Sequence, residues 1–149
     1  MKDFQMKYKI IDNFLSKKIF EYITSINFNS INANEVLGHH NKIYKNGQIQ
    51  TSCFDEKNLI EIHNHCHLKA LEVLKELAPK KLELYEYSDF NIIETGKDYT
   101  FPIHRDHVNK LLSGVIYLNP GKNTGTIIYD DEKGTNPNEI EWKQNRALF

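Results

Sequence analysis

The chain lacks the long apolar runs and the cysteine pairs that mark several large protein classes. No apolar run exceeds about five residues, whereas roughly 20 are needed to span a bilayer. The N-terminal residues contain no apolar core of the kind that secretory signals carry. Two cysteines, Cys53 and Cys66, are too few for a disulfide framework in 149 residues. These absences predict a soluble protein of a reducing compartment, and we expect it to be cytoplasmic.

The chain also lacks an excess of charge of either sign. Its 19 Lys and Arg residues nearly balance 20 Asp and Glu residues, which gives a net charge of -1. This balance predicts no electrostatic binding of nucleic acid or of an anionic membrane surface. A length of 149 residues is enough to bury a core, so we expect a single domain over residues 1–149. The sequence does not indicate an oligomeric state.

Two helices are predicted in the first half of the chain. Ser16 is a favourable N-cap, and apolar residues then recur at helical spacing up to Ile26. A second helix begins at Asp55 or Glu56 and ends at Pro79. Its apolar face is formed by Leu59, Ile62, Cys66, Ala70, Val73 and Leu77. Between the two helices, residues 28–53 are polar, with a hairpin or loop expected around Asn46-Gly47.

The second half of the chain is rich in β-forming residues. After a short strand within residues 7–14, further strands are predicted within 82–93, 99–106, 111–119, 125–130 and 138–149. Turn-forming residues separate the later strands, at 119–121 and 134–137. The predicted fold is therefore α+β, with a helical part over residues 1–79 and an antiparallel sandwich or barrel over 80–149.

One short motif in the second half has the chemistry of a metal site. In a strand, residues i and i+2 point to the same face, so His104 and Asp106 would reach one metal ion together. Arg105 and His107 would then point away. An imidazole and a carboxylate make two thirds of the 2-His-1-carboxylate triad of non-haem Fe(II) oxygenases. Alone, such a pair is more often solvated than bound to a metal.

The segments around this motif resemble the 2-oxoglutarate/Fe(II)-dependent dioxygenases, in particular their prolyl-hydroxylase-like branch. Four pieces match in order: ETGKDYTFPIHRD, GVIYLN, NTGTIIYD and NEIEWKQNRALF. The N-terminal IIDNFLSKKIFEYI also resembles the usual entry of the family, a strand followed by a helix. The resemblance covers about 70 residues well, and its specificity lies in the order and spacing of the pieces.

The resemblance implies a fold and a set of site residues. The fold would be N-terminal helices packed on a double-stranded β-helix, or jelly roll, that lacks its last strands. His104 and Asp106 would be the first two ligands of Fe(II). Tyr117 would hydrogen-bond the distal carboxylate of 2-oxoglutarate, and Tyr99 would line the same pocket. The alternative for both tyrosines is ordinary packing on a strand, which is also our expectation for Trp142.

The implied activity is hydroxylation of an unactivated C–H bond on a peptidyl residue, such as proline, or on a small molecule. The cofactors would be Fe(II) and the cosubstrate 2-oxoglutarate, with ascorbate as an accessory reductant, and the co-products succinate and CO2. The main alternative is a non-catalytic binding domain on the same scaffold.

The resemblance stops short of two residues that the family needs. None of the seven histidines follows His107, so the second iron-ligand His is missing. The basic residue that would bind the cosubstrate lies beyond that His, and Lys143 and Arg146 come too early. Three explanations remain: a fragment of a longer protein, a degenerate member, or substitution by His107 or an upstream His. We expect a fragment, because the sequence ends abruptly within an apolar run. Substitution by His107 is the least favoured explanation, because strand geometry turns His107 away from Asp106.

A second histidine cluster, HNHCH, falls within the second helix. His63 and His67 are one turn apart and could bind a metal on the helix face. A zinc site needs three or four ligands, so it would require help from His39 or His40. We expect partly exposed histidines beside a core helix, with a zinc-binding module as a third functional hypothesis. The segment 28–53 is either a lid over the pocket or a solvated hairpin.

Overall fold

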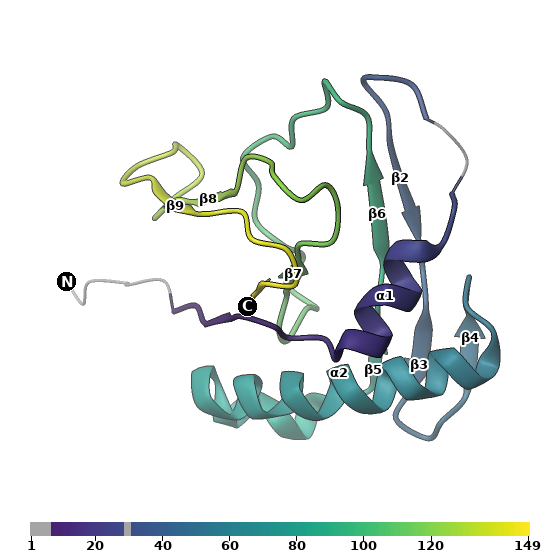
Figure 1. Cartoon of the computed structure of the whole chain (residues 1–149). Coiled ribbons are helices and arrows are strands. Elements are labelled where there is room, and N and C mark those ends of the chain that lie inside the picture. The colour runs from purple at the N-terminus through teal and green to yellow at the C-terminus, as the bar shows by residue number, and fades with distance from the viewer. Residues whose placement is uncertain (1–6, 29–30) are drawn as a thin grey trace. The chain divides into compact units, whose positions relative to one another are not determined.

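The computed structural model describes residues 7–28 and 31–149 and shows an α+β fold with several small antiparallel sheets (Figure 1). The chain divides into two compact units, one formed by residues 1–26 and 102–149 and the other by residues 27–101. Among the described residues, the strands form sheets of two or three strands that do not close into a barrel. The α+β prediction is confirmed, and the single domain over residues 1–149 stays a prediction.

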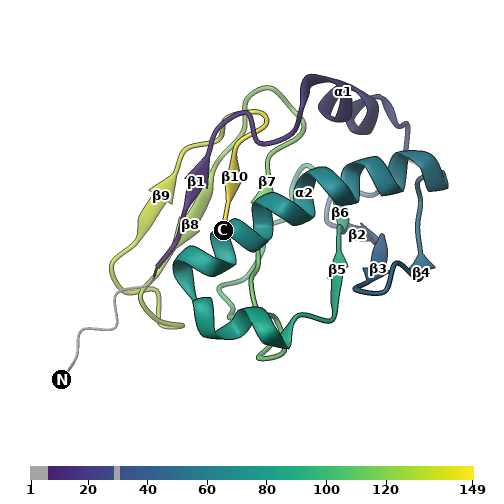
Figure 2. The same cartoon turned by 90° about the horizontal axis from the view of Figure 1, so that it is seen from below.

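The first unit joins the two ends of the described chain in one antiparallel sheet. Its strands lie in the order β1 (Ile10–Ile11), β10 (Ala147–Leu148), β7 (Val115–Ile116), side by side in Figure 2. Ala147 is the central residue, paired with Ile11 on one side and Ile116 on the other. A separate hairpin pairs β8 (Thr126–Ile128) with β9 (Asn138–Ile140).

The helix α1 (Lys17–Ser25) of this unit begins where the sequence predicts. The Ser16 hydroxyl accepts a hydrogen bond from the Ile19 N–H at 3.3 Å, which satisfies one of the free donors of the first turn. Ile19 and Ile23 are buried, as the helical spacing of the apolar residues predicts. Ile26 lies just past the helix, as its C-cap.

The second unit is built around the long helix α2 (Glu56–Leu77). The Asp55 carboxylate caps it by accepting from the Asn58 N–H at 3.0 Å, and Leu59, Ile62 and Cys66 are buried. Two small sheets complete the unit: β2 (Val36–His39) with β6 (Ile92–Thr95), and β4 (Ile49–Thr51), β3 (Lys42–Tyr44) and β5 (Tyr87–Asp89) in that order. No helix in the described part of the chain is long and apolar enough to cross a membrane.

The hairpin predicted around Asn46-Gly47 is confirmed as the connection between β3 and β4. Gly47 has a φ of 90°, a backbone conformation that glycine adopts without a steric cost. Its N–H donates to the Tyr44 carbonyl at 2.8 Å, and the Tyr44 N–H donates to the Gln48 carbonyl at 2.9 Å. Residues 28–53 thus form three short strands, apart from residues 29 and 30, which lie outside the described residues.

Asn41 is the buried polar residue that connects the parts of the second unit. It is fully buried, and its side-chain amide donates to the carbonyls of His39 and Phe90 at 3.1 and 2.7 Å. Its side-chain oxygen accepts from the Ser52 hydroxyl and the Cys53 N–H at 2.7 and 2.8 Å. Burial of an amide is tolerated when its donors and acceptors are all paired, as they are here.

Three of the predicted strands are wrong in part or in full. Residues 79–84 form a 3-10 helix, η1 (Pro79–Leu84), because proline favours the first turn of a helix. Residues 99–106 form no strand: they are largely exposed, and Pro102 has no N–H to pair. Residues 138–149 form two strands rather than one, because the chain turns at Asn145, whose φ is 61°.

We predict that Asn41→Ala destabilises the protein by about 2–4 kcal/mol. The substitution leaves two carbonyls, one hydroxyl and one N–H without their buried partner. Urea unfolding followed by circular dichroism measures the loss. Asn64→Ala is the matched control, because Asn64 is exposed on α2 and alanine favours the helix. Equal stability of the two variants would contradict the role of Asn41.

Candidate functional site

The predicted iron ligand His104 lies in an exposed loop of the first unit, ahead of β7. Its Nδ1 atom lies 2.9 Å from the Pro102 carbonyl oxygen. Because a carbonyl only accepts, Nδ1 carries the proton and donates it. The lone pair of the ring is therefore on Nε2, which is the atom that a histidine fixed in this way offers to a metal.

The second predicted ligand, Asp106, is held as a carboxylate. Burial raises its pKa, but the hydrogen bond and charge of Lys110, the neighbouring Ser113 hydroxyl and the His104 ring, when it is protonated, lower that pKa by more. The closest contact is from the Lys110 ammonium to Asp106 Oδ1, at 2.8 Å. The ionised form, which metals require, therefore persists below the usual pKa of the side chain.

The structure places these two residues near each other without the strand that the sequence predicted. The argument that turned His107 away from Asp106 depended on that strand and no longer applies. His107 is disfavoured as a ligand for a different reason, because its Nδ1 accepts a hydrogen bond from the Asn109 N–H at 3.3 Å. In the neutral ring the proton is then on Nε2, which leaves no free lone pair for a metal.

The loop that carries His104 is supported by the turn between β8 and β9. Arg105 forms an ion pair with Glu132, with 3.3 Å between Nε and Oε1. The Ile103 side chain lies 3.2 Å from the position that a Cβ of Gly134 would occupy. Gly134 has a φ of 81°, and Asp131 closes the turn by accepting from the Lys133 and Thr135 N–H groups.

No group of three or more metal-binding side chains converges within residues 7–28 and 31–149. His104 and Asp106 would therefore be two ligands of the predicted iron site, and the described residues bring no third ligand to them. The Ser113 hydroxyl is a further polar group near Asp106. This hydroxyl contributes to the lowered pKa of Asp106. Its oxygen is buried and makes no hydrogen bond with another described residue.

Tyr117, predicted to bind the cosubstrate, is buried at the end of β7. Its hydroxyl donates to Thr126 Oγ1 at 2.7 Å and accepts from the Thr126 N–H at 3.0 Å. Its ring stacks on Trp142, with 4.4 Å between centroids and 18° between planes. This packing agrees with the expectation for Trp142. A carboxylate would have to replace Thr126 Oγ1 as the acceptor of the phenol proton.

Tyr99, the other predicted cosubstrate residue, lies in the second unit. Its ring packs edge-to-face on Phe101, with centroids 4.9 Å apart and 83° between the ring planes. Its N–H donates to the Gly96 carbonyl at 3.1 Å. The role of Tyr99 in lining the cosubstrate pocket stays a prediction. The role of residues 28–53 as a lid also stays a prediction.

The two late basic residues both bind Asp12. Arg146 contacts the two carboxylate oxygens with its Nε and Nη2 atoms at 2.6 and 3.2 Å, and Lys143 Nζ contacts Oδ2 at 2.8 Å. The hydrogen bonds from Arg146 and then Lys143 hold the pKa of Asp12 well below its usual range. Neither cation is therefore free to bind a cosubstrate carboxylate, as their early positions already suggested.

The histidines of α2 stack on each other. The rings of His63 and His67 are 4.9 Å apart and inclined by 12°. Burial lowers the pKa of both, and the charge of His67 lowers that of His63 further. His39 and His40 are paired with Glu94 and Asp89 at 2.6 and 2.8 Å. The arrangement is the one expected for partly exposed histidines beside a core helix.

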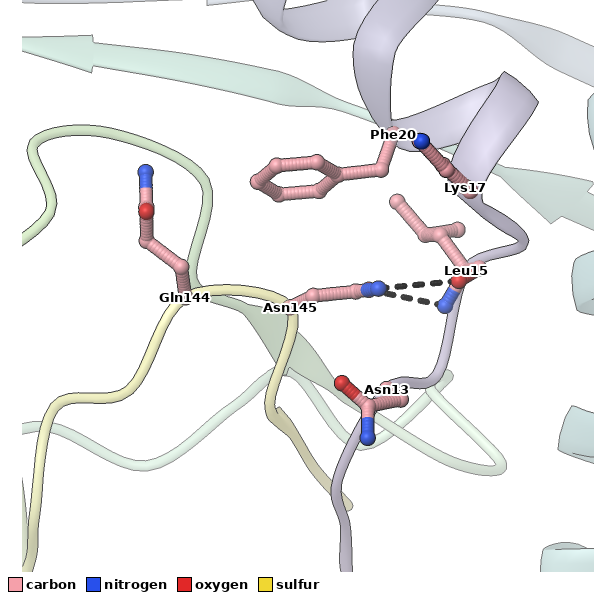
Figure 3. Close-up of a pocket in the computed structure, with 6 residues that line it drawn as sticks. All are labelled: Asn13, Leu15, Lys17, Phe20, Gln144 and Asn145. Atoms are coloured by element: carbon pink, nitrogen blue, oxygen red, sulfur yellow. Dashed lines mark hydrogen bonds between the residues drawn. The ribbon is translucent and has the colours of Figure 1, made fainter.

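Sequence reasoning missed the small pocket of about 400 Å³ in the first unit. Figure 3 shows the amide of Asn145 reaching the backbone of Leu15, with the ring of Phe20 above the Asn145 side chain in this view. Both bonds of that amide are 2.8 Å long. The other lining residues are Asn13, Lys17 and Gln144. These residues lie in two of the segments that carry the resemblance, but only the structure brings these segments from opposite ends of the sequence together.

Comparison with known proteins gives no match to a family model, to a curated protein or to a solved structure.

We predict that Asp12→Asn weakens the dependence of stability on acid. The pKa of Asp12 is lowered in the folded state, so its stabilising effect is present above its ordinary value of 3.8 and is lost as the pH falls below it. The variant should be less stable at pH 7 and should lose less stability between pH 5 and pH 2. Unfolding by urea across this pH range measures the difference. Asp98→Asn, on an exposed loop, should behave like the wild type.

We also predict an acid-sensitive contribution from the stacked histidines. Because the pKa values of His63 and His67 are lowered in the folded state, the unfolded chain takes up protons first as the pH falls below the ordinary value of 6.5. Stability should therefore fall from pH 7 to pH 5, and less so in His63→Phe. His65→Gln, on the same helix, should keep the wild-type profile. An unchanged profile in His63→Phe would contradict the prediction.

Proposed function

We propose that the chain is part of an Fe(II)- and 2-oxoglutarate-dependent oxygenase, with His104 and Asp106 as two of the iron ligands. The observation that carries the proposal is the state of this pair: a histidine whose free lone pair is on Nε2 beside an ionised carboxylate. The buried Ser113 oxygen, which lacks a hydrogen-bond partner among the described residues, is a further polar group near Asp106. One imidazole and one carboxylate are two of the three protein ligands of a 2-His-1-carboxylate Fe(II) site.

The protein's part in this chemistry is to hold and orient. The Pro102 carbonyl fixes the tautomer of His104, and the loop that carries both ligands contacts the β8–β9 turn through Ile103, against Gly134, and the exposed pair of Arg105 with Glu132. When bound, Fe(II) and 2-oxoglutarate would supply the oxidation of an unactivated C–H bond by O2, with succinate and CO2 as co-products and ascorbate as an accessory reductant. The substrate would be a peptidyl residue, such as proline, or a small molecule.

The finer features of the fold belong to the same proposal. An antiparallel jelly roll over residues 80–149 is compatible with the β1-β10-β7 sheet and the β8–β9 hairpin. A reducing, cytoplasmic location fits the two free cysteines, Cys53 and Cys66. Neither nucleic acid nor a membrane surface is proposed as a partner, because the net charge is only -1.

A non-catalytic binding domain is the second candidate, and the cosubstrate residues favour it. The Tyr117 hydroxyl is already bonded to Thr126, and the cations of Lys143 and Arg146 are already bonded to Asp12. In this alternative, the chain keeps the fold of the family but has no site that binds 2-oxoglutarate. It predicts that no succinate is made from 2-oxoglutarate, whatever metal is present.

The test is succinate release from 2-oxoglutarate by the full chain, supplied with Fe(II), ascorbate and O2. We expect His104→Ala and Asp106→Ala each to lower the rate, and the affinity for Mn(II) as a stand-in for Fe(II), by about tenfold or more. His107→Ala is the matched control and should leave both quantities near the wild-type values. Mn(II) binding that persists in both ligand variants would contradict the proposed site.

A further inference from the structure

The Asp106 carboxylate is engaged by a cation of the protein itself. Lys110 Nζ lies 2.8 Å from Asp106 Oδ1, and the two residues are four positions apart. A turn brings them together, in which the Lys110 N–H donates to the His107 carbonyl at 2.9 Å. The side chains of Lys110 and Asp106 are 55% and 41% exposed, so water surrounds much of the pair.

Such a pair is weak enough to be exchanged. Exposed ion pairs contribute little to stability, because water screens the charges and two flexible side chains are restrained. A divalent cation has twice the charge of an ammonium and would receive a second ligand from His104 Nε2. It would therefore compete effectively for the Asp106 oxygen, while the ammonium moves into solvent on its flexible stem.

We propose that Lys110 is a displaceable counter-ion of Asp106, which a divalent cation must replace to bind at His104 and Asp106. This inference rests on the proposed iron site and adds a residue that sets its metal affinity. Without a metal, the ammonium keeps the carboxylate paired. With a metal, the same ammonium is a nearby positive charge that opposes binding. Both effects lower the affinity of the site, and both are removed with the charge of Lys110.

The test compares Mn(II) binding by the full chain and its variants at low ionic strength, by electron paramagnetic resonance of free Mn(II). We expect Lys110→Met to bind Mn(II) about three- to tenfold more tightly than the wild type. Lys110→Arg keeps the charge and should stay within about twofold. Lys122→Met removes one charge from an exposed position of the same unit, so it controls for net charge and should also stay within about twofold.

The dependence of Mn(II) affinity on ionic strength distinguishes a counter-ion role of Lys110 from a structural role. The gain in Lys110→Met should shrink as the ionic strength rises to about 0.5 M, because the competing charge is screened. Loss of a merely structural contact would weaken Mn(II) binding at every salt concentration. An affinity in Lys110→Met that is unchanged or weaker than that of the wild type overturns the inference.

The ligand variants separate this inference from the proposed function. If His104→Ala and Asp106→Ala abolish Mn(II) binding and Lys110→Met leaves it unchanged, the iron site stands and the counter-ion role falls. If Mn(II) binds equally well without His104 and Asp106, the proposed function falls and takes the counter-ion role with it. If neither the wild type nor Lys110→Met binds Mn(II) at millimolar concentration, the proposed function and the counter-ion role also both fall.

Discussion

The first unit depends on the contacts that join its N-terminal strand to the turn before its last strand. The Asn145 side chain pairs with both backbone groups of Leu15, and Arg146 forms a two-point ion pair with Asp12. These residues are 130 or more positions apart in sequence. Their contacts hold β10 in the middle of its sheet, because a strand of two residues has too few ladder hydrogen bonds to be stable alone.

That central strand determines where the predicted site residues lie. The pairing of Ala147 with Ile116 sets the position of β7, and Tyr117 follows directly. The Tyr117 N–H donates to the Arg146 carbonyl at 3.0 Å, and its hydroxyl reaches the β8–β9 hairpin through Thr126. The turn of that hairpin also contacts the loop of His104, through the ion pair of Arg105 with Glu132. The candidate ligands therefore depend on contacts made far from them in sequence.

The elements that the sequence predicted well are those with local causes. Asp55 caps α2, Pro79 follows its end, and Gly47 closes a hairpin, and each of these acts through its nearest neighbours in the chain. The wrong strand predictions at residues 79–84 and 138–149 come from local effects of Pro79 and Asn145 that the sequence analysis did not weigh. Residues 99–106 have the composition of a strand but no neighbouring strand, and a β-former without a pairing partner stays extended and unpaired.

For the site, the residue types could be predicted and their state could not. His104 and Asp106 were identified from a motif and its flanks, whereas the tautomer of the ring depends on the Pro102 carbonyl. Lys110 looked like an ordinary solvated lysine, because only the turn at His107 brings its ammonium to Asp106. The ion pair of Arg146 with Asp12 was equally hidden, because the two residues are 134 positions apart in sequence.

The loop setting of the ligands has a consequence for how such a site would work. On a strand, backbone pairing would fix the separation of the two side chains before any metal arrives. In a loop, no backbone pairing fixes that separation, so binding would also have to order the ligands. Ordering costs free energy that a rigid strand would not require. The exposed ammonium of Lys110 adds little to this order, and its charge opposes the metal.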